Sequence, residues 1–250
     1  MRAKKITISW LVVLAVLSVV AHSAIAADAD VLAECAYWED EETTVPSARD
    51  TVLCYIYADI NGFNLYSFGV NLAYNDAKLT VSNAESNMDV WFLGDESYTD
   101  AYLSPGNAVT IGGKLDPNVP TAGVGGQRVL LSKVAFTRDV PGEPISPNAA
   151  TYFGIGLGLG KPDPYANFVD NSGDPLQQVL DNKIDGVAFE VKVAEGGDAD
   201  AGGTINATDA QFVSSIFFGT SPWSVFADCN GDGDINAVDA QCISAKFFGG

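Results

Sequence analysis

The chain of 250 residues carries 32 acidic and 13 basic side chains, a formal net charge of -19, and a single histidine, His22. His22 lies in a segment with the features of a removable signal, so the mature chain is expected to lack histidine, which excludes Ser-His-Asp triads and His-ligated zinc sites. The acidic balance excludes nucleic acid as a partner, because such binding needs clustered Lys and Arg.

Residues 1–26 have the composition of a secretory signal peptide. Arg2, Lys4 and Lys5 precede an uncharged apolar stretch, and Ala24-Ile25-Ala26 gives the small-x-small pattern that a signal peptidase recognises. The alternative is a retained membrane anchor, but the apolar stretch is shorter than the roughly 20 residues that a spanning helix needs. We therefore expect a secreted protein, extracellular or at the cell surface, with no membrane span after cleavage.

The four cysteines form two close pairs in the sequence, Cys35 with Cys54 and Cys229 with Cys242. In an oxidising compartment the simplest arrangement is one disulfide at each end of the chain. Of the three possible connectivities, this one keeps each bridge within its own module.

The long middle of the chain alternates apolar and polar residues as β-strands do. Residues 51–60, 68–74 and 187–193 show the alternation best, and 109–113 and 128–137 lie between them, separated by Gly, Pro, Asn and Asp turns. Many short strands with such turns predict a mainly β fold, an antiparallel β-sandwich over residues 27–194.

A glycine-rich run, residues 151–160, resembles a phosphate loop only superficially, because it lacks the Lys-Ser/Thr of a P-loop. We expect a strand here, with Phe153, Ile155, Leu157 and Leu159 facing the core. The opposite face would then be bare glycine, open to close packing by a neighbouring segment or to a flat ligand.

The C-terminal region contains an internal repeat. Residues 198–219 and 228–249 match at 12 of 22 positions without a gap. Each copy begins with an acidic, glycine-bearing loop and continues into an apolar-periodic stretch, which predicts two loop–helix units.

The second loop has the oxygen-ligand spacing of an EF-hand calcium loop, in which alternate residues converge on one cation. Gly233 at position 6 permits the sharp turn, and Asp234 offers its backbone carbonyl at position 7. The side-chain ligands expected at positions 1, 3, 5, 9 and 12 are Asp228, Asn230, Asp232, Asn236 and Asp239.

The first loop has the same pattern with one ligand missing. Position 5 is Gly202, which has no side-chain oxygen, so we expect calcium to bind here more weakly than in the second loop. The ligands expected in this loop are Asp198, Asp200, Thr204 through its carbonyl, Asn206 and Asp209. The cofactor predicted is therefore calcium at two sites.

Paired loop–helix repeats of this length resemble a type I-like dockerin domain, over residues 195–250. The resemblance implies a small α-helical module with two EF-hand-like units that binds cohesin domains. It also implies that the two residues before each final Asp contact the partner; here these are Ala207, Thr208, Ala237 and Val238.

The preceding sandwich resembles a cohesin domain through residues 51–60, 68–85, 128–139 and 187–193. Cohesins have a jelly-roll sandwich that binds dockerins. The Cys35–Cys54 pair departs from that family's pattern.

These resemblances imply a non-catalytic adaptor of cellulosome-type assemblies, with partners that bear cohesins or dockerins, or with further copies of itself joined head-to-tail. The alternative is a carbohydrate-binding sandwich docked through its dockerin to a polysaccharide-degrading complex, with Trp38, Trp91, Tyr98 and Tyr102 stacking on sugar rings. The acidic residues of the sandwich nominate no catalytic pair, so no enzyme activity is expected.

Overall fold

The computed structural model describes residues 29–39, 50–91, 102–104, 107–115, 123–140, 145, 148–160, 168–170, 184 and 186–249. The signal peptide expected at residues 1–26 and the side chains of Tyr98 and Tyr102 lie outside the described residues. Among the helices that are described, none is long and apolar enough to cross a membrane.

The first layer of the fold is a five-stranded sheet in the order β3-β6-β2-β1-β9. Its pairs are antiparallel as the sequence predicted, but β1 and β9 run parallel, so the sheet is mixed. The bounds are β1 Ala29–Tyr37, β2 Thr51–Ala73, β3 Leu79–Ser86, β6 Val124–Arg138 and β9 Val187–Glu195.

The second layer is built on the later half of β2, which pairs with β5, β7 and β8, while β4 adds to β5. The sequence predicted two strands where β2 is one strand of 23 residues that passes from one layer to the other. The bounds of the added strands are β4 Tyr102–Ser104, β5 Ala108–Lys114, β7 Gly156–Leu159 and β8 Val169–Asp170.

The core lies between these layers and follows the predicted alternation. Val52, Cys54 and Ile56 from the first half of β2 share one apolar cluster with Val70 and Leu72 from the second half. The structure contains the Cys35–Cys54 disulfide, which joins residues directly opposite each other on β1 and β2.

Trp38 and Trp91 do not support the alternative in which exposed aromatic side chains stack on sugar rings. Trp38 is 2% exposed and Trp91 is 0% exposed, so neither presents a ring face to solvent. Their size explains the difference, because burying a large aromatic ring in a sandwich contributes more than leaving it on the surface.

The glycine-rich run does not form the single strand that we predicted. Its start belongs to a short helix, α1 Ala149–Phe153, whose N-cap Asn148 accepts a hydrogen bond from the Thr151 N–H at 2.9 Å. Gly154 ends the helix with a φ of 64°, which glycine adopts without steric cost, and β7 follows. The alternation of apolar residues and glycine suggested a strand and gave no sign of the helix cap at Asn148. Leu159, which we expected to face the core, is 40% exposed.

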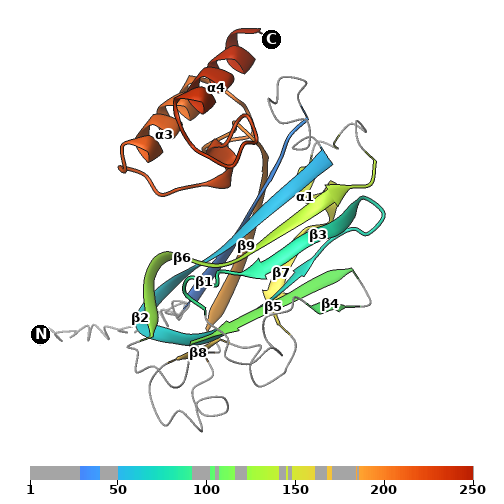
Figure 1. Ribbon diagram of the computed structural model, residues 1–250, viewed down its shortest axis with the longest axis vertical. Coiled ribbons are helices and arrows are strands. Elements are labelled where there is room, and N and C mark those ends of the chain that lie inside the picture. The colour runs from blue at the N-terminus through green and yellow to red at the C-terminus, as the bar shows by residue number, and fades with distance from the viewer. Residues whose placement is uncertain are drawn as a thin grey trace, which may run out of the picture.

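The C-terminal region consists of two loops, each followed by a helix. The helices α3 Ala207–Phe217 and α4 Ala237–Gly249 lie side by side, beyond one end of the sandwich (Figure 1). Val213 of α3 and Ile243 of α4 belong to one buried apolar cluster, which also contains Ala199 and Cys229 of the two loops. A single 3₁₀ turn, η3 Val225–Ala227, precedes the second loop.

The sandwich and the C-terminal region share a third apolar cluster. Ala36, Trp38 and Ala194 of the sandwich pack against Val225 and Phe226 of η3. The two regions are therefore in direct contact through the segment that connects the two repeats.

Candidate metal centre

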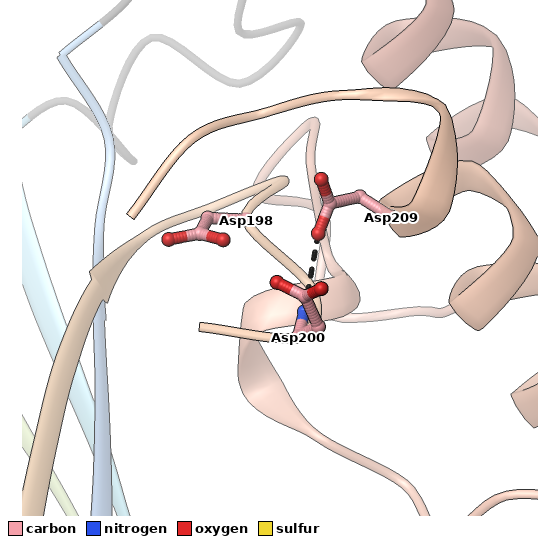
Figure 2. A group of neighbouring side chains, drawn as sticks. All are labelled: Asp198, Asp200 and Asp209. Atoms are coloured by element: carbon pink, nitrogen blue, oxygen red, sulfur yellow. Dashed lines mark hydrogen bonds between the residues drawn. The ribbon is translucent and has the colours of Figure 1, made fainter. Parts of the chain in front are cut away.

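The first loop brings three carboxylates together. The ligand oxygens of Asp198, Asp200 and Asp209 lie within 4.8 Å of one another, the only such group of His, Cys, Asp or Glu side chains in the part of the chain that is described. Figure 2 shows Asp198 and Asp200 on the loop and Asp209 reaching towards them from the first turn of α3. These are positions 1, 3 and 12 of the predicted ligand set.

Backbone N–H groups orient these carboxylates. Asp198 accepts hydrogen bonds from Gly202 and Gly203 at 2.9 and 2.8 Å, and Asp209 accepts one from the Asn206 N–H at 2.8 Å. The Asn206–Asp209 pair is a capping box, so α3 begins where the ligand spacing needs its final carboxylate.

The second loop repeats the backbone hydrogen bonds from its glycine at position 6 and its asparagine at position 9. Asp228 accepts from the Gly233 N–H at 2.9 Å, and Asp239 accepts from the Asn236 N–H at 2.8 Å. Asp232, which replaces a glycine of the first loop, accepts from the side-chain amide of Asn230 at 2.8 Å. The sequence repeat is therefore also a repeat of local structure.

The two asparagines at position 9 have a role that the ligand spacing did not predict. Asn206 accepts from the Thr208 N–H and Asn236 from the Val238 N–H, both at 2.8 Å, so each caps a helix. The side-chain amide of Asn206 also donates to the Thr204 carbonyl at 2.9 Å. Asp234, whose carbonyl is the position-7 ligand that the sequence predicted, has an exposed side chain.

The carboxylates at positions 1 and 12 are buried. Asp209 and Asp239 are 0% exposed, Asp228 is 2% exposed, and Asp198 is 4% exposed. Burial raises the pKa of Asp198, Asp209 and Asp239, and it raises the pKa of Asp228 to about 6, although backbone N–H donors oppose the shift.

Buried negative groups of this kind cost free energy unless a cation compensates them. The available donors are carboxylate, amide and carbonyl oxygens in a turn that glycine sharpens, and this all-oxygen set fits a hard cation with six to eight ligands, such as calcium. The residues present therefore fit a calcium ion in each loop.

A disulfide distinguishes the second loop. Cys229, at position 2, is joined to Cys242 on α4. The first repeat has Ala199 and Phe212 at these positions, and there the contact is apolar packing alone. The bridge therefore ties the second loop to its own helix.

The residues that the family resemblance assigns to partner binding lie on the surface. Ala207, Thr208, Ala237 and Val238 are all exposed at the first turns of α3 and α4.

Sequence reasoning missed a second exposed feature at the other ends of the same helices. Phe217 and Phe218 are 61% and 76% exposed, and Phe247 and Phe248 are 45% and 80% exposed. The signal was visible in the sequence, because both repeats end in Phe-Phe-Gly.

A comparison with family models supports the reading of the C-terminal region. The model of the dockerin type I domain matches residues 196–247, which contain both loops and both helices. No curated protein matches the chain.

Solved structures similar to the chain are cohesins and complexes that contain them. CaCohA2 from Clostridium acetobutylicum is 16% identical with a TM-score of 0.39, over 68% of this chain and 94% of that one. The Coh-OlpC-Doc435 type I cohesin–dockerin complex from Clostridium thermocellum is 17% identical with a TM-score of 0.40, over 70% of this chain and 99% of that one. A non-cellulosomal cohesin from Archaeoglobus fulgidus is 16% identical with a TM-score of 0.37, over 68% of this chain and 90% of that one.

Proposed function

We propose that the protein is a secreted, non-catalytic adaptor that assembles extracellular protein complexes. After removal of residues 1–26, residues 27–194 form a cohesin-like domain and residues 195–250 form a dockerin-like domain stabilised by calcium. The first domain receives a dockerin and the second engages a cohesin, on other proteins or on further copies of this chain.

The observation that carries this proposal is the pair of in-phase loops with buried carboxylates. Asp209 and Asp239 are held by backbone N–H groups in the same way and are fully buried. One acidic turn of this kind occurs often without an ion, whereas two turns with equal spacing and equal bonding favour a module built around two cations. Calcium then contributes directly to the folding of this module.

We call the dockerin-like domain, residues 195–250, the plug. The surface through which we propose that it binds a cohesin lies on α3 and α4. The helix starts expose small or apolar side chains at Ala207, Thr208, Ala237 and Val238, and the helix ends expose the two phenylalanine pairs. Large exposed aromatic side chains on a secreted domain are typical of protein interfaces.

We call the surface through which the cohesin-like domain would bind a dockerin the socket. We propose that it is the outer face of β5, β2 and β7. Asn71 lies opposite Thr110 on β5 and opposite Gly158 on β7, so all three face away from the buried Val70 and Leu72. Most other residues of this face are small, namely Gly69, which is buried, Ala73, Ala108, Gly112 and Gly156, and the face ends at the pair Ser67 and Lys114. Such small side chains let a partner helix approach the sheet closely.

The plug is not folded back over this socket. The C-terminal region contacts the sandwich at Ala36, Trp38 and Ala194, and Figure 1 shows α3 and α4 on the opposite side of the sandwich from β4 and β5. Among the described residues, the two proposed surfaces therefore do not cover each other, as a head-to-tail or adaptor arrangement requires.

The test is the mass of the full-length protein by size-exclusion chromatography with light scattering, in calcium and in EDTA. Self-assembly predicts multimers in calcium that dissociate in EDTA, because chelation unfolds the plug. Replacing Phe218 and Phe248 with serine serves as the control variant and should give monomers that still bind calcium.

A protein that stays monomeric in calcium at high concentration rejects self-assembly. The adaptor version is then tested by binding of the same full-length protein to immobilised cohesins and dockerins. Failure to bind any member of either panel in calcium overturns the proposal.

A further inference from the structure

Trp38, at the end of β1, reaches into the second calcium loop. Its indole N–H donates to the main-chain oxygen of Asp228 at 2.9 Å, across 190 residues of sequence, and the bond is buried. Asp228 is the first ligand position of the second loop, so a residue of the sandwich contacts the metal-binding loop directly.

The first loop satisfies the equivalent carbonyl in a different way. The main-chain oxygen of Asp198 accepts from the N–H of Ala201, at position 4 of its own loop, at 2.9 Å. The position-4 residue of the second loop is Gly231, and its N–H donates at 2.8 Å to the side chain of Asp228. The indole of Trp38 thus takes the place of a loop N–H, which leaves that N–H for the carboxylate.

This exchange changes how firmly the first ligand is held. The Asp228 carboxylate accepts three backbone N–H groups, from Gly231, Asp232 and Gly233, at 2.8, 3.2 and 2.9 Å. The Asp198 carboxylate accepts two, from Gly202 and Gly203. A carboxylate with more fixed donors has fewer orientations to lose when a cation binds.

The position of Trp38 is fixed by close packing at the junction of the two regions. A Cβ atom at Gly196 would overlap the indole, so the backbone approaches the ring as only glycine allows. Next to it, the Gly197 N–H donates to the Phe226 carbonyl at 2.7 Å.

A buried polar cluster fixes the same junction from the other side. Arg128 on β6 binds both carboxylate oxygens of Glu34 at 3.0 and 2.8 Å and also donates to the Trp223 carbonyl at 2.8 Å. The Ser224 hydroxyl donates to Glu34 at 3.1 Å. The segment that leads into the second loop is therefore held on the sandwich independently of Trp38.

We propose that Trp38 is a positioning residue for the second calcium site, so that the sandwich completes the metal-binding loop of the module that follows it. The inference rests on the proposed calcium binding of both loops. It adds that the second loop binds calcium more tightly partly because the first domain holds its first ligand, which links the two domains through the ion.

The experiment is a calcium titration of the full-length protein followed by NMR at the amide groups of Gly203 and Gly233, each of which donates to the first carboxylate of its own loop. Trp38→Phe removes the N–H donor and should weaken binding in the second loop roughly fivefold to tenfold, the effect of one hydrogen bond. The first loop should titrate as in the wild type.

Trp91→Phe is the matched control. Trp91 is also buried, and its indole N–H donates to the Leu130 carbonyl at 3.1 Å. Both residues belong to the sandwich, and neither belongs to a loop of the C-terminal region. This variant loses an equivalent bond and should lower the melting temperature while leaving both calcium affinities unchanged.

Gly196→Ala provides a second route, because the new Cβ displaces the indole without changing its chemistry. It should also weaken the second loop selectively, and Trp91→Phe serves as the control for this variant as well. Equal weakening of both loops by Trp38→Phe, or no weakening by either junction variant, overturns the inference. Absence of calcium binding in the wild type instead refutes the proposed calcium sites.

Discussion

The two acidic loops of the C-terminal region share several backbone hydrogen bonds but have different surroundings. In both, the position-6 glycine donates to the first carboxylate and the position-9 N–H donates to the last, with distances that agree within 0.1 Å. They differ in the residue at position 5, in the disulfide and in the contact with Trp38. The repeat therefore sets the backbone of each loop, and we expect position 5, the disulfide and the contact with Trp38 to set the difference in calcium affinity.

The largest effect is expected from the disulfide that only the second loop has. Replacing Cys229 and Cys242 with alanine opens a bridge across a sequence separation of 13 and should lower the free energy of unfolding of the C-terminal region by about 3 kcal/mol. Thermal unfolding in calcium measures the change. A change in unfolding free energy within the error of the measurement would show that the disulfide does not distinguish the stability of the second loop from that of the first.

A matched gain tests the same point in the first loop. Ala199→Cys with Phe212→Cys places two cysteines at the equivalent positions, and oxidation should stabilise the region relative to the reduced double variant. If the bridge forms without stabilising, the second bridge acts through something other than restraint of the loop.

The next effect comes from the last carboxylate of each loop. Asp239→Asn removes a negative ligand and should weaken calcium binding in the second loop by roughly 100-fold, since ligand losses exceed the effects of second-shell changes. Asp209→Asn should do the same in the first loop. Isothermal titration of the two variants separates the sites, and a variant that weakened both loops equally would contradict their independence.

Stability without calcium should depend on pH in the opposite direction to most acidic proteins. Burial raises the pKa of Asp228 from its usual value near 3.8 to about 6, so the folded chain binds a proton that the unfolded chain releases. This contribution is complete below about pH 4 and is lost as the pH rises through 6. In EDTA the C-terminal region should therefore be less stable at pH 7 than at pH 4.5, by about 2 kcal/mol.

Calcium should reverse that trend, because the ion binds the ionised carboxylates. Asp228→Asn removes the titrating group and is the control for the EDTA series. Melting temperatures that do not change between pH 4.5 and 7 in EDTA would show that Asp228 is not buried as described.

The sequence predicted those parts of the molecule that depend on local spacing. Residues 228–239 form the loop and the helix start that their spacing predicted, because glycine at position 6 leaves few alternative backbones. Their role as calcium ligands stays a prediction. The alternation from Val52 to Ile60 likewise placed the buried face of β2 correctly.

The sequence did not predict features that depend on distant partners. Trp38 is separated from Asp228 by 190 residues, and a lone tryptophan before a turn gives no sign of whether it faces solvent or a second domain. The run from Thr151 failed for a different reason. The helix there begins after the N-cap Asn148 and stops at Gly154. Its five residues are too few to show a helical period in the sequence.

The smallest effect is a gain, obtained by giving the first loop the ligands of the second. A Cβ at Gly202 would lie 2.6 Å from the Asp200 side chain, so an acidic residue there needs a neutral neighbour at position 3. Asp200→Asn with Gly202→Asp reproduces Asn230 and Asp232, keeps the number of carboxylates and adds one ligand. We expect calcium affinity in the first loop to rise roughly tenfold, about 1.4 kcal/mol.

Gly202→Asp alone is the control for this gain and should bind less well than the double variant, because two adjacent carboxylates then repel each other. If the double variant reaches the affinity of the second loop, position 5 accounts for the whole difference between the loops. If it falls short, the remaining difference belongs to the two features that loop ligands cannot supply, the Cys229–Cys242 bridge and the indole of Trp38. Combining the double variant with Trp38→Phe then separates these contributions, because only the second loop should respond to the loss of the indole.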